Sequence, residues 1–140
     1  MRRLIAGLVM LAAVACMFVP SVRFTEDRDT VRLARVIYAL GKGESYETKL
    51  KLGTVAMNRI DCPWFPGELG EVLRDQQQFP AGERYDGESL RAAHALLSGE
   101  RDLPEDALYY QAADASMPWG ETGRVASAGN YNFYSESGND

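Results

Sequence analysis

Glu44 is the acidic residue whose place in the sequence best suits acid–base chemistry. It lies beside Gly43, in a glycine-containing bend between two predicted helices, where its side chain can point into a cleft. Removal of water from such a cleft raises the pKa of a carboxyl, as a general acid at neutral pH requires. An acid just before Ser45 also interacts favourably with the N-terminus of the following helix. On its own, the position favours this local role.

A second group of residues combines aromatic rings with side-chain amides, as sugar-binding clefts do. Aromatic faces stack on the apolar faces of pyranose rings, and amides hydrogen-bond to hydroxyl and N-acetyl groups. For any single ring, a place in the core is the more common explanation. The combination is densest at Gln77–Phe79 and Asn130–Tyr134, and there it points to a sugar-binding surface.

Metal and nucleophile chemistry has little support in the sequence. No HExxH motif, Walker loop or nucleophile elbow is present, and one histidine with Cys62 is too little for a His/Cys metal cluster. His94 falls on the apolar face of its predicted helix, which predicts a neutral ring with a buried partner. Cys62 is predicted to be a small, partly buried side chain. No metal and no cofactor is expected.

Helices must position most of these residues. The apolar stripe of Leu33, Ile37 and Leu40 predicts a helix that the following glycines end, and Ser45 is the predicted N-cap of a second helix. The further predicted elements are helices at Leu69–Leu73 and Asp86–Gly99 and two strands that pair with each other, Ala107–Gln111 and Asn130–Tyr134. The predicted fold class is α+β, mainly helical with a small late antiparallel sheet.

The composition bounds the class of protein. The chain has 140 residues, 46% of them hydrophobic and 25% charged, which is typical of one compact domain with an apolar segment attached. The formal net charge of -5 argues against a nucleic-acid partner, because neutralising phosphates requires clustered Lys and Arg.

Residues 1–22 form a separate targeting segment. A basic start is followed by an apolar stretch from Leu4 to Val19 that contains no acidic residue. This pattern fits a cleaved signal peptide, an uncleaved membrane anchor or, third, a lipid-modified Cys16. Each alternative exports the domain at residues 23–140 to the cell envelope or the extracellular space, and an anchor would leave residues 1–22 in the membrane.

Five blocks of the sequence, matched in order and spacing over roughly Leu33 to Tyr134, carry a resemblance to a known family. They are Leu33–Ala39, Gly43–Glu47, Val55–Ile60, Gln78–Phe79 and Gly129–Tyr134. The chain thereby resembles the SleB/CwlJ-type cell wall hydrolases, which include spore cortex-lytic enzymes. The resemblance implies a lysozyme-like fold and cleavage of the glycan strand of peptidoglycan. It also implies which residues surround the substrate groove: Gln78, Phe79, Tyr109, Tyr110, Asn130, Tyr131 and Phe133.

The chain departs from this family at the catalytic acid. Family members typically read Ala-Glu-Ala-Arg-Gly-Glu where this chain has Ala39–Glu44, so the family's catalytic Glu aligns with Leu40. A leucine cannot protonate a glycosidic oxygen. Members often have His where this chain has Tyr131. Glu44 aligns with the family's second, more variable acid and is the predicted catalytic residue if the bend swings it into the cleft.

The sequence therefore supports two alternative functions of different classes. The first is a peptidoglycan glycan-strand hydrolase or lytic transglycosylase that uses a displaced acid, Glu44. The second is a catalytically inactive, peptidoglycan-binding pseudoenzyme that acts at the envelope by binding wall or by assisting a partner protein, a true hydrolase. A third and weaker reading is a structural exported protein without a ligand.

Overall fold

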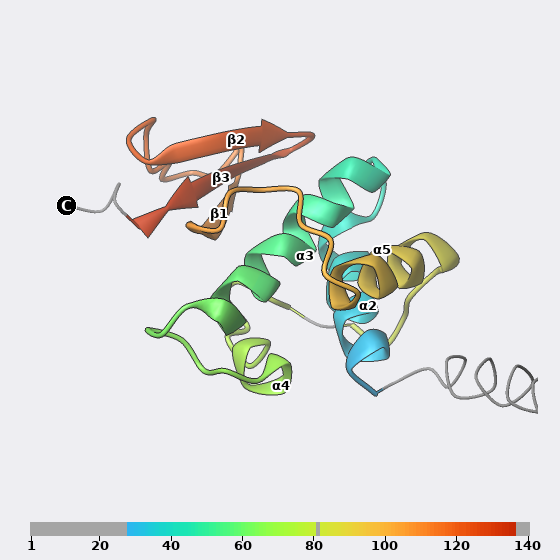
Figure 1. Ribbon diagram of the computed structural model, residues 1–140. Coiled ribbons are helices and arrows are strands. Elements are labelled where there is room, and N and C mark those ends of the chain that lie inside the picture. Colours follow the sequence, from blue (N-terminus) through green and yellow to red (C-terminus); the bar gives the residue numbers. More distant parts are fainter. Residues whose placement is uncertain (1–27, 81, 137–140) are drawn as a thin grey trace, which may run out of the picture.

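The computed structural model describes residues 28–80 and 82–136, which form a group of helices and a small sheet (Figure 1). The helices are α2 (Arg28–Gly41), α3 (Tyr46–Asp61), α4 (Leu69–Val72) and α5 (Gly87–Leu97). The strands are β1 (Ala107–Ala112), β2 (Arg124–Ala128) and β3 (Tyr131–Ser135). The predicted targeting segment at residues 1–22 lies outside the described residues. Within the described ranges, no helix has the length and apolar character that a membrane span requires.

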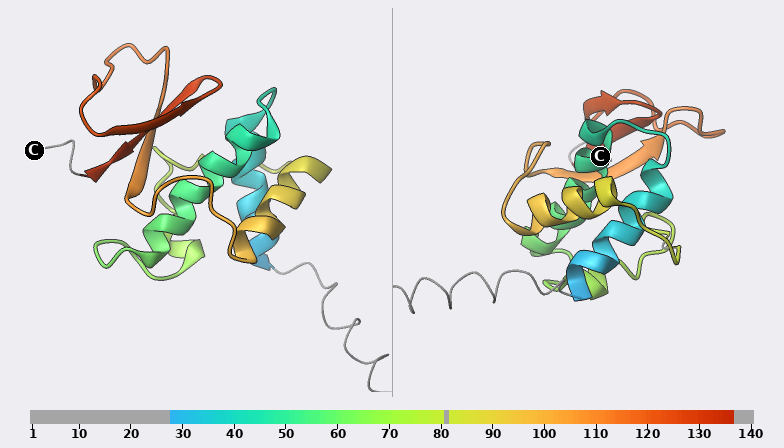
Figure 2. Two further views of the ribbon diagram at one scale, coloured as in Figure 1. Left: turned by 45° about the horizontal axis from the view of Figure 1, so that its top comes forward. Right: turned by 90° about the vertical axis from the view of Figure 1, so that its right-hand side faces the viewer.

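Helix α3 is the central element of the fold. It is buried along nearly its whole length from Thr48 to Arg59, because α2 and α5 pack on one side of it and β1 packs on the other (Figures 1 and 2). A helix covered on all sides needs no continuous polar face, which explains why its apolar stripe is less distinct than that of α2. Ser45 caps α3 as predicted, since its hydroxyl accepts a hydrogen bond of 3.2 Å from the Thr48 backbone N–H.

The core forms where α2, α3 and α5 meet. Leu33 and Ile37 of α2 pack with Leu52 and Val55 of α3 and with Leu96 of α5, and all five side chains are fully buried. Each side chain of this size contributes about 1.5–3 kcal/mol on burial. The predicted apolar stripe of α2 is thus confirmed, and the rigid core fixes where the loops at the ends of α2 and α3 lie.

The helix after Tyr85 begins where the sequence predicts. The Asp86 carboxylate accepts a hydrogen bond of 2.8 Å from the Ser89 backbone N–H, and the Ser89 hydroxyl accepts one from the Asp86 backbone N–H. The hydrogen bond from the Ser89 backbone N–H is the main reason that the pKa of Asp86 lies below its usual value. The short predicted helix at Leu69–Leu73 is confirmed as α4, which ends at Val72.

The sheet places β3 between the other two strands, and both pairings are antiparallel. The predicted pairing of Ala107–Gln111 with Asn130–Tyr134 is confirmed, because Tyr110 of β1 lies opposite Phe133 of β3. The strand β2 was not predicted. Its segment is short, rich in small residues and half-exposed, so it carries no clear alternation of its own. The α+β fold class, mainly helical with a small late antiparallel sheet, is confirmed.

Candidate functional site

Glu44 lies where the bend after α2 meets the turn between β2 and β3. Its backbone N–H donates to the Gly41 carbonyl at 2.9 Å, which closes the bend. Its Oε1 atom accepts two hydrogen bonds from Asn130, one of 2.7 Å from the side-chain Nδ2 and one of 3.3 Å from the backbone N–H. The half-buried Glu44 carboxylate is therefore held by a residue 86 positions later in the chain.

Gly129 allows the Glu44 carboxylate to pack directly on this turn. A Cβ atom at position 129 would lie 2.0 Å from Glu44 Oε2 and 3.2 Å from Thr48 Oγ1. The backbone of Gly129 also has a φ of +53°, in the left-handed region that glycine adopts without strain. The turn thus requires glycine for two reasons, and one of them is the position of the Glu44 carboxylate.

Tyr131 joins the same turn to the end of α2. Its hydroxyl donates a hydrogen bond of 2.6 Å to the Leu40 backbone carbonyl. Burial raises the pKa of Tyr131, and the negative charges of Glu44 and Asp114 raise it further. The structure therefore brings together Leu40, Glu44 and Tyr131. The Leu40 side chain itself is half-buried and packs against the core, as its place in the apolar stripe predicts.

Tyr110 extends this cluster into the sheet. Its ring meets the Tyr131 ring edge-to-face, with centroids 5.4 Å apart. The Gln78 side chain accepts a hydrogen bond from the Tyr110 backbone N–H and donates one to its carbonyl, both at 3.3 Å, and the Tyr110 hydroxyl donates to the Gln78 carbonyl. Burial is the main reason that the pKa of Tyr110 is raised well above its usual range. The side-chain amide of Gln78 thus pairs with the backbone of Tyr110 in β1 as a neighbouring strand would.

Two of the residues that the resemblance placed at the groove do not fit a direct contact with sugar. Phe79 and Phe133 are both 0% exposed, because each ring fills the core between the sheet and the helices. The two rings therefore belong to the core, the alternative that the sequence left open for any single ring, and they support neighbouring residues. Tyr109 also lies apart from Glu44, since its half-buried ring meets Phe65 edge-to-face at 6.2 Å.

Arg59 and Asn58 were not predicted to have a role, yet they connect α3 to β1. The Arg59 guanidinium is 2% exposed and donates to the Leu108 carbonyl at 2.8 Å and to Asp75 at 3.2 Å. Asn58 Nδ2 donates to the Pro104 and Ala107 carbonyls at 2.8 and 3.1 Å. A buried arginine must be paired and hydrogen-bonded, so this network fixes the strand that carries Tyr110. The only signal in the sequence was the block Val55–Ile60 itself.

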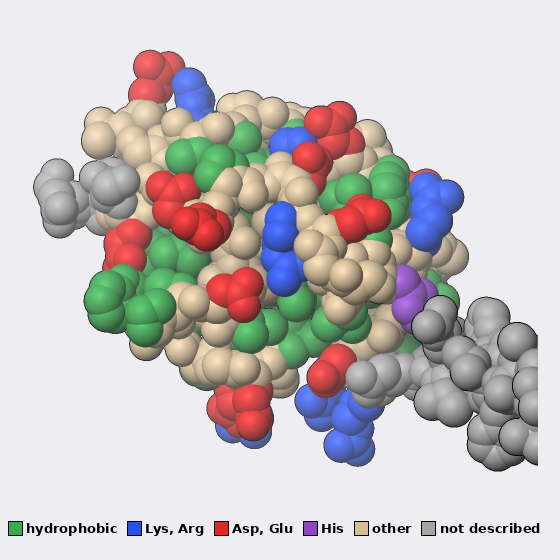
Figure 3. Space-filling view, in the orientation of Figure 1, with side chains coloured by type: hydrophobic (Ala, Val, Ile, Leu, Met, Phe, Trp, Pro, Cys, Tyr) green, Lys and Arg blue, Asp and Glu red, His purple; other side chains and the backbone are tan. Residues whose placement is uncertain are grey.

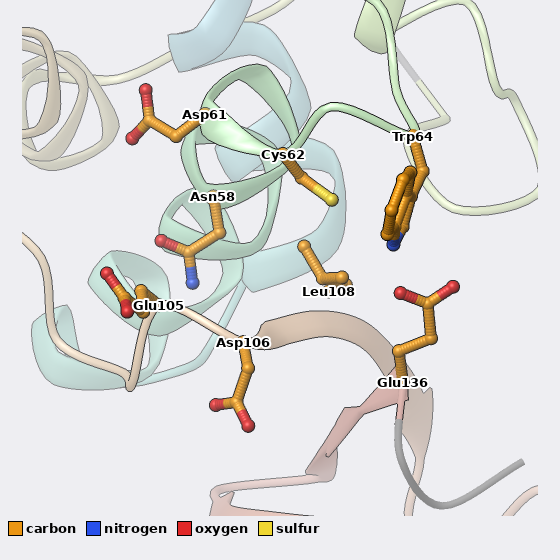
Figure 4. Close-up of a pocket in the computed structure, with 8 residues that line it drawn as sticks. All are labelled: Asn58, Asp61, Cys62, Trp64, Glu105, Asp106, Leu108 and Glu136. Carbon is orange, nitrogen blue, oxygen red and sulfur yellow. The ribbon is translucent and has the colours of Figure 1, made fainter.

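A separate hollow of about 840 Å³ lies at the other end of α3 (Figure 4). Trp64, 72% exposed, lines it together with four carboxylates, those of Asp61, Glu105, Asp106 and Glu136. The 16 residues of α3 span about 24 Å, which separates this hollow from Glu44. None of the residues predicted to contact sugar lines it.

The single histidine and the described cysteine have no place near Glu44. His94 is exposed at the surface (Figure 3), so the prediction of a buried neutral ring was wrong. The helix α5 packs on α2 and α3 through Ala92, Ala93 and Leu96, and this narrower stripe leaves His94 outside. Cys62 is half-buried, as predicted, and it is not in a disulfide.

Comparison with known proteins connects these residues to one family. The sequence model of the family described as Cell Wall Hydrolase matches residues 43–134, a range that includes Glu44 and begins after Leu40. The spore cortex-lytic enzyme of Bacillus subtilis is 32% identical over 99 residues, 66% of this chain and 32% of that protein. The enzyme of the same name from Halalkalibacterium halodurans is 26% identical over 99 residues, 66% of this chain and 30% of that protein. The chain thus spans about a third of the length of these relatives.

Two solved structures resemble the fold. The catalytic domain of the Bacillus cereus SleB protein superimposes with a TM-score of 0.67 at 19% identity, over 79% of this chain and 93% of that one. The catalytic domain of the germination-specific lytic transglycosylase SleB from Bacillus anthracis gives a TM-score of 0.65 at 20% identity, over 80% and 98%. At these identities the likeness concerns the fold alone.

Proposed function

This chain belongs to the cell wall hydrolase family, and from that premise we propose that it binds the glycan strand of peptidoglycan and cleaves it with Glu44 as the general acid. The groove would run along the bend between α2 and α3 and the turn between β2 and β3. Asn130 and Tyr131 would line it on the sheet side. Gln78 and Tyr110 would support it from below, through the ring contact of Tyr110 with Tyr131.

The observation that carries this proposal is the contact between Glu44 and Asn130. The resemblance aligns the family's acid with Leu40, near the end of α2, and Glu44 follows four residues later in the bend. The hydrogen bonds from Asn130 draw the Glu44 carboxylate toward Tyr131, whose hydroxyl already reaches the Leu40 carbonyl. These contacts support Glu44 as the displaced acid.

In the proposed reaction, Glu44 donates a proton to the departing glycosidic oxygen. The bond to the sugar carbon then breaks, and either water or a hydroxyl of the same sugar completes the cleavage. The first route gives a new reducing end and the second an anhydro end. Protonation by a positioned acid contributes about 10²–10⁴-fold to the rate.

The alternative function is a pseudoenzyme that binds peptidoglycan without cleaving it. The observation in its favour is Leu40, with which the resemblance aligns the family's acid and whose apolar side chain packs on the core. Such a protein would keep the surface formed by Asn130 and Tyr131 and would act at the envelope, by holding wall or by assisting a partner hydrolase. Glu44 would then serve only to join the α2–α3 bend to the sheet.

The substitution Glu44→Gln distinguishes the two functions. The amide keeps an oxygen that can accept the hydrogen bonds of Asn130, but it cannot donate a proton as a carboxylic acid does. Muropeptide analysis of digested peptidoglycan should show a loss of about 100-fold or more in new glycan ends. The exposed Glu100→Gln is the matched control and should leave cleavage unchanged. If the unmodified chain binds peptidoglycan and releases no fragments, the pseudoenzyme is the function.

The substitution Leu40→Glu tests the family's position directly. A carboxyl there costs about 1–3 kcal/mol of stability, because it loses apolar burial and part of its hydration. The same desolvation raises the pKa of the new carboxyl, which suits a general acid. We expect a moderately destabilised protein with increased release of glycan fragments. Suppose that the unmodified chain is active, that its activity depends on Glu44, and that Leu40→Glu folds without any gain in activity. Glu44 is then the acid, and the site needs no second one.

We also propose that the domain is exported. The basic start and the apolar stretch of residues 1–22 support this proposal, and the proposed substrate lies outside the cytoplasmic membrane. Cell fractionation should place the protein in the envelope or the medium. Release from membranes by detergent alone would favour an uncleaved anchor, whereas full-length protein in the cytosol would contradict export.

A further inference from the structure

A second cavity, of about 210 Å³, lies between α2 and α4 and is lined by two arginines. Arg32 and Arg35 come from neighbouring turns of α2, so their guanidinium groups lie on one side of the helix. Val36 and Leu73 provide the apolar part of the lining. The cavity therefore offers two positive charges beside a small apolar surface.

Both arginines are exposed, and within residues 28–80 and 82–136 neither guanidinium is paired with a carboxylate. Other arginines of the same fold do have such partners: Arg59 with Asp75, Arg74 with Glu71, and Arg124 with Glu121. The chain as a whole carries a net charge of -5. Two exposed arginines with no carboxylate partner among the described residues thus share one cavity, where both are available to an anion.

Gly70 holds the Arg32 guanidinium at this cavity. A Cβ atom at position 70 would lie 2.8 Å from Arg32 Nη1, so the absence of a side chain lets the guanidinium lie across α4. A larger cavity of about 720 Å³ adjoins on the other side of Arg32, and three carboxylates line that one, those of Asp29, Glu68 and Glu71. An anion would therefore be repelled there and attracted to the side that Arg35 shares.

We propose that the cavity between Arg32 and Arg35 binds the terminal carboxylate of a peptide stem of peptidoglycan. A guanidinium pairs with a carboxylate through two parallel hydrogen bonds, a geometry that Arg provides and Lys does not. Val36 and Leu73 suit the methyl group of a terminal alanine. This inference rests on the proposed function, because it names a part of the same substrate.

The position of the cavity fits a stem attached to a glycan strand at Glu44. Arg35 lies less than two helical turns before Leu40, about 8 Å along the axis of α2. An extended stem of three or four residues reaches about 10–14 Å. A sugar in the groove could thus hold its stem along α2, and the arginines would select strands that still carry peptides.

The test measures binding of N-acetyl-D-alanyl-D-alanine and of its C-terminal amide to the full-length chain in mild detergent. The acid should bind at least tenfold more tightly than the amide, because the amide lacks the negative charge. Arg35→Gln should remove about tenfold in affinity. Gly70→Ala should weaken binding too, since it displaces Arg32 without changing any charge. The matched control is Arg28→Gln, which removes a charge from the same helix outside the cavity and should change affinity less than twofold.

Peptidoglycan with and without its stems separates this inference from the proposed function. If the cavity acts as proposed, removal of the stems by an amidase weakens binding of the unmodified chain and leaves Arg35→Gln unaffected. Equal binding of acid and amide, or an equal loss in Arg28→Gln and Arg35→Gln, would overturn the inference. If the chain still binds and cleaves stem-free glycan when the inference is overturned, the proposed function stands. If the chain binds no glycan at all, the proposed function itself is overturned.

Discussion

The substitution Gly129→Ala perturbs the contact that holds Glu44. The new Cβ would lie 2.0 Å from Glu44 Oε2, so the carboxylate must leave its place and give up both hydrogen bonds from Asn130. These bonds are accessible to solvent, and together they are worth about 1 kcal/mol. Placing alanine at a φ of +53° costs roughly another 1–2 kcal/mol. The free energy of unfolding should therefore fall by about 2–3 kcal/mol.

Gly43→Ala is the matched control for this substitution. Gly43 has a φ of +82°, but a Cβ there would meet no atom within 4 Å. It should therefore cost only the backbone term of about 1–2 kcal/mol. Urea unfolding measures both variants, and the difference of about 1 kcal/mol between them reports the displaced carboxylate. Glycan-fragment release should fall in Gly129→Ala and be retained in Gly43→Ala.

A double-substitution cycle decides whether Glu44 is the cause. In a Glu44→Ala background the carboxylate is absent, so Gly129→Ala should cost no more than Gly43→Ala does. A coupling of about 1 kcal/mol between positions 44 and 129 is expected. If Gly129→Ala costs the same with and without Glu44, the contact contributes nothing to stability, and the reasoning that places Glu44 at the groove through this turn is refuted.

Three further predictions concern the supporting residues. Tyr131→Phe removes the hydroxyl that donates to the Leu40 carbonyl, so the free energy of unfolding in urea should fall by about 1 kcal/mol. An unchanged free energy of unfolding would contradict this prediction. Because burial raises the pKa of Tyr110 above its ordinary 10.0, the folded protein keeps that proton longer than the unfolded chain does. Stability should therefore be constant up to about pH 10 and fall above it, and Tyr110→Phe should reduce this alkaline loss in thermal unfolding. Arg59→Leu leaves the Leu108 carbonyl without its donor and should cost about 3 kcal/mol or more, whereas the exposed Arg84→Gln should stay within about 0.5 kcal/mol.

Local patterns in the sequence were sufficient for the helices and for two of the three strands. The stripe of Leu33 and Ile37 marks the buried face of α2 because the helical period is fixed by backbone geometry. Ser45 and Asp86 mark helix starts because a side-chain oxygen can satisfy a free backbone N–H. These rules act over a few residues and need no knowledge of the fold. They fail for β2, whose small, half-exposed residues pair only because β3 is already in place.

The sequence also determined the family, since the family model matches residues 43–134. Only the tertiary structure decided which of the predicted site residues are buried. Phe79 and Phe133 share the aromatic character of Tyr131, yet they are buried, because burial depends on which strand face meets the helices. The meeting of Glu44 with Asn130, 86 residues apart, has the same origin. The core between α2, α3 and the sheet fixes where their loops lie. No local pattern in the sequence contains the distance between Glu44 and Asn130.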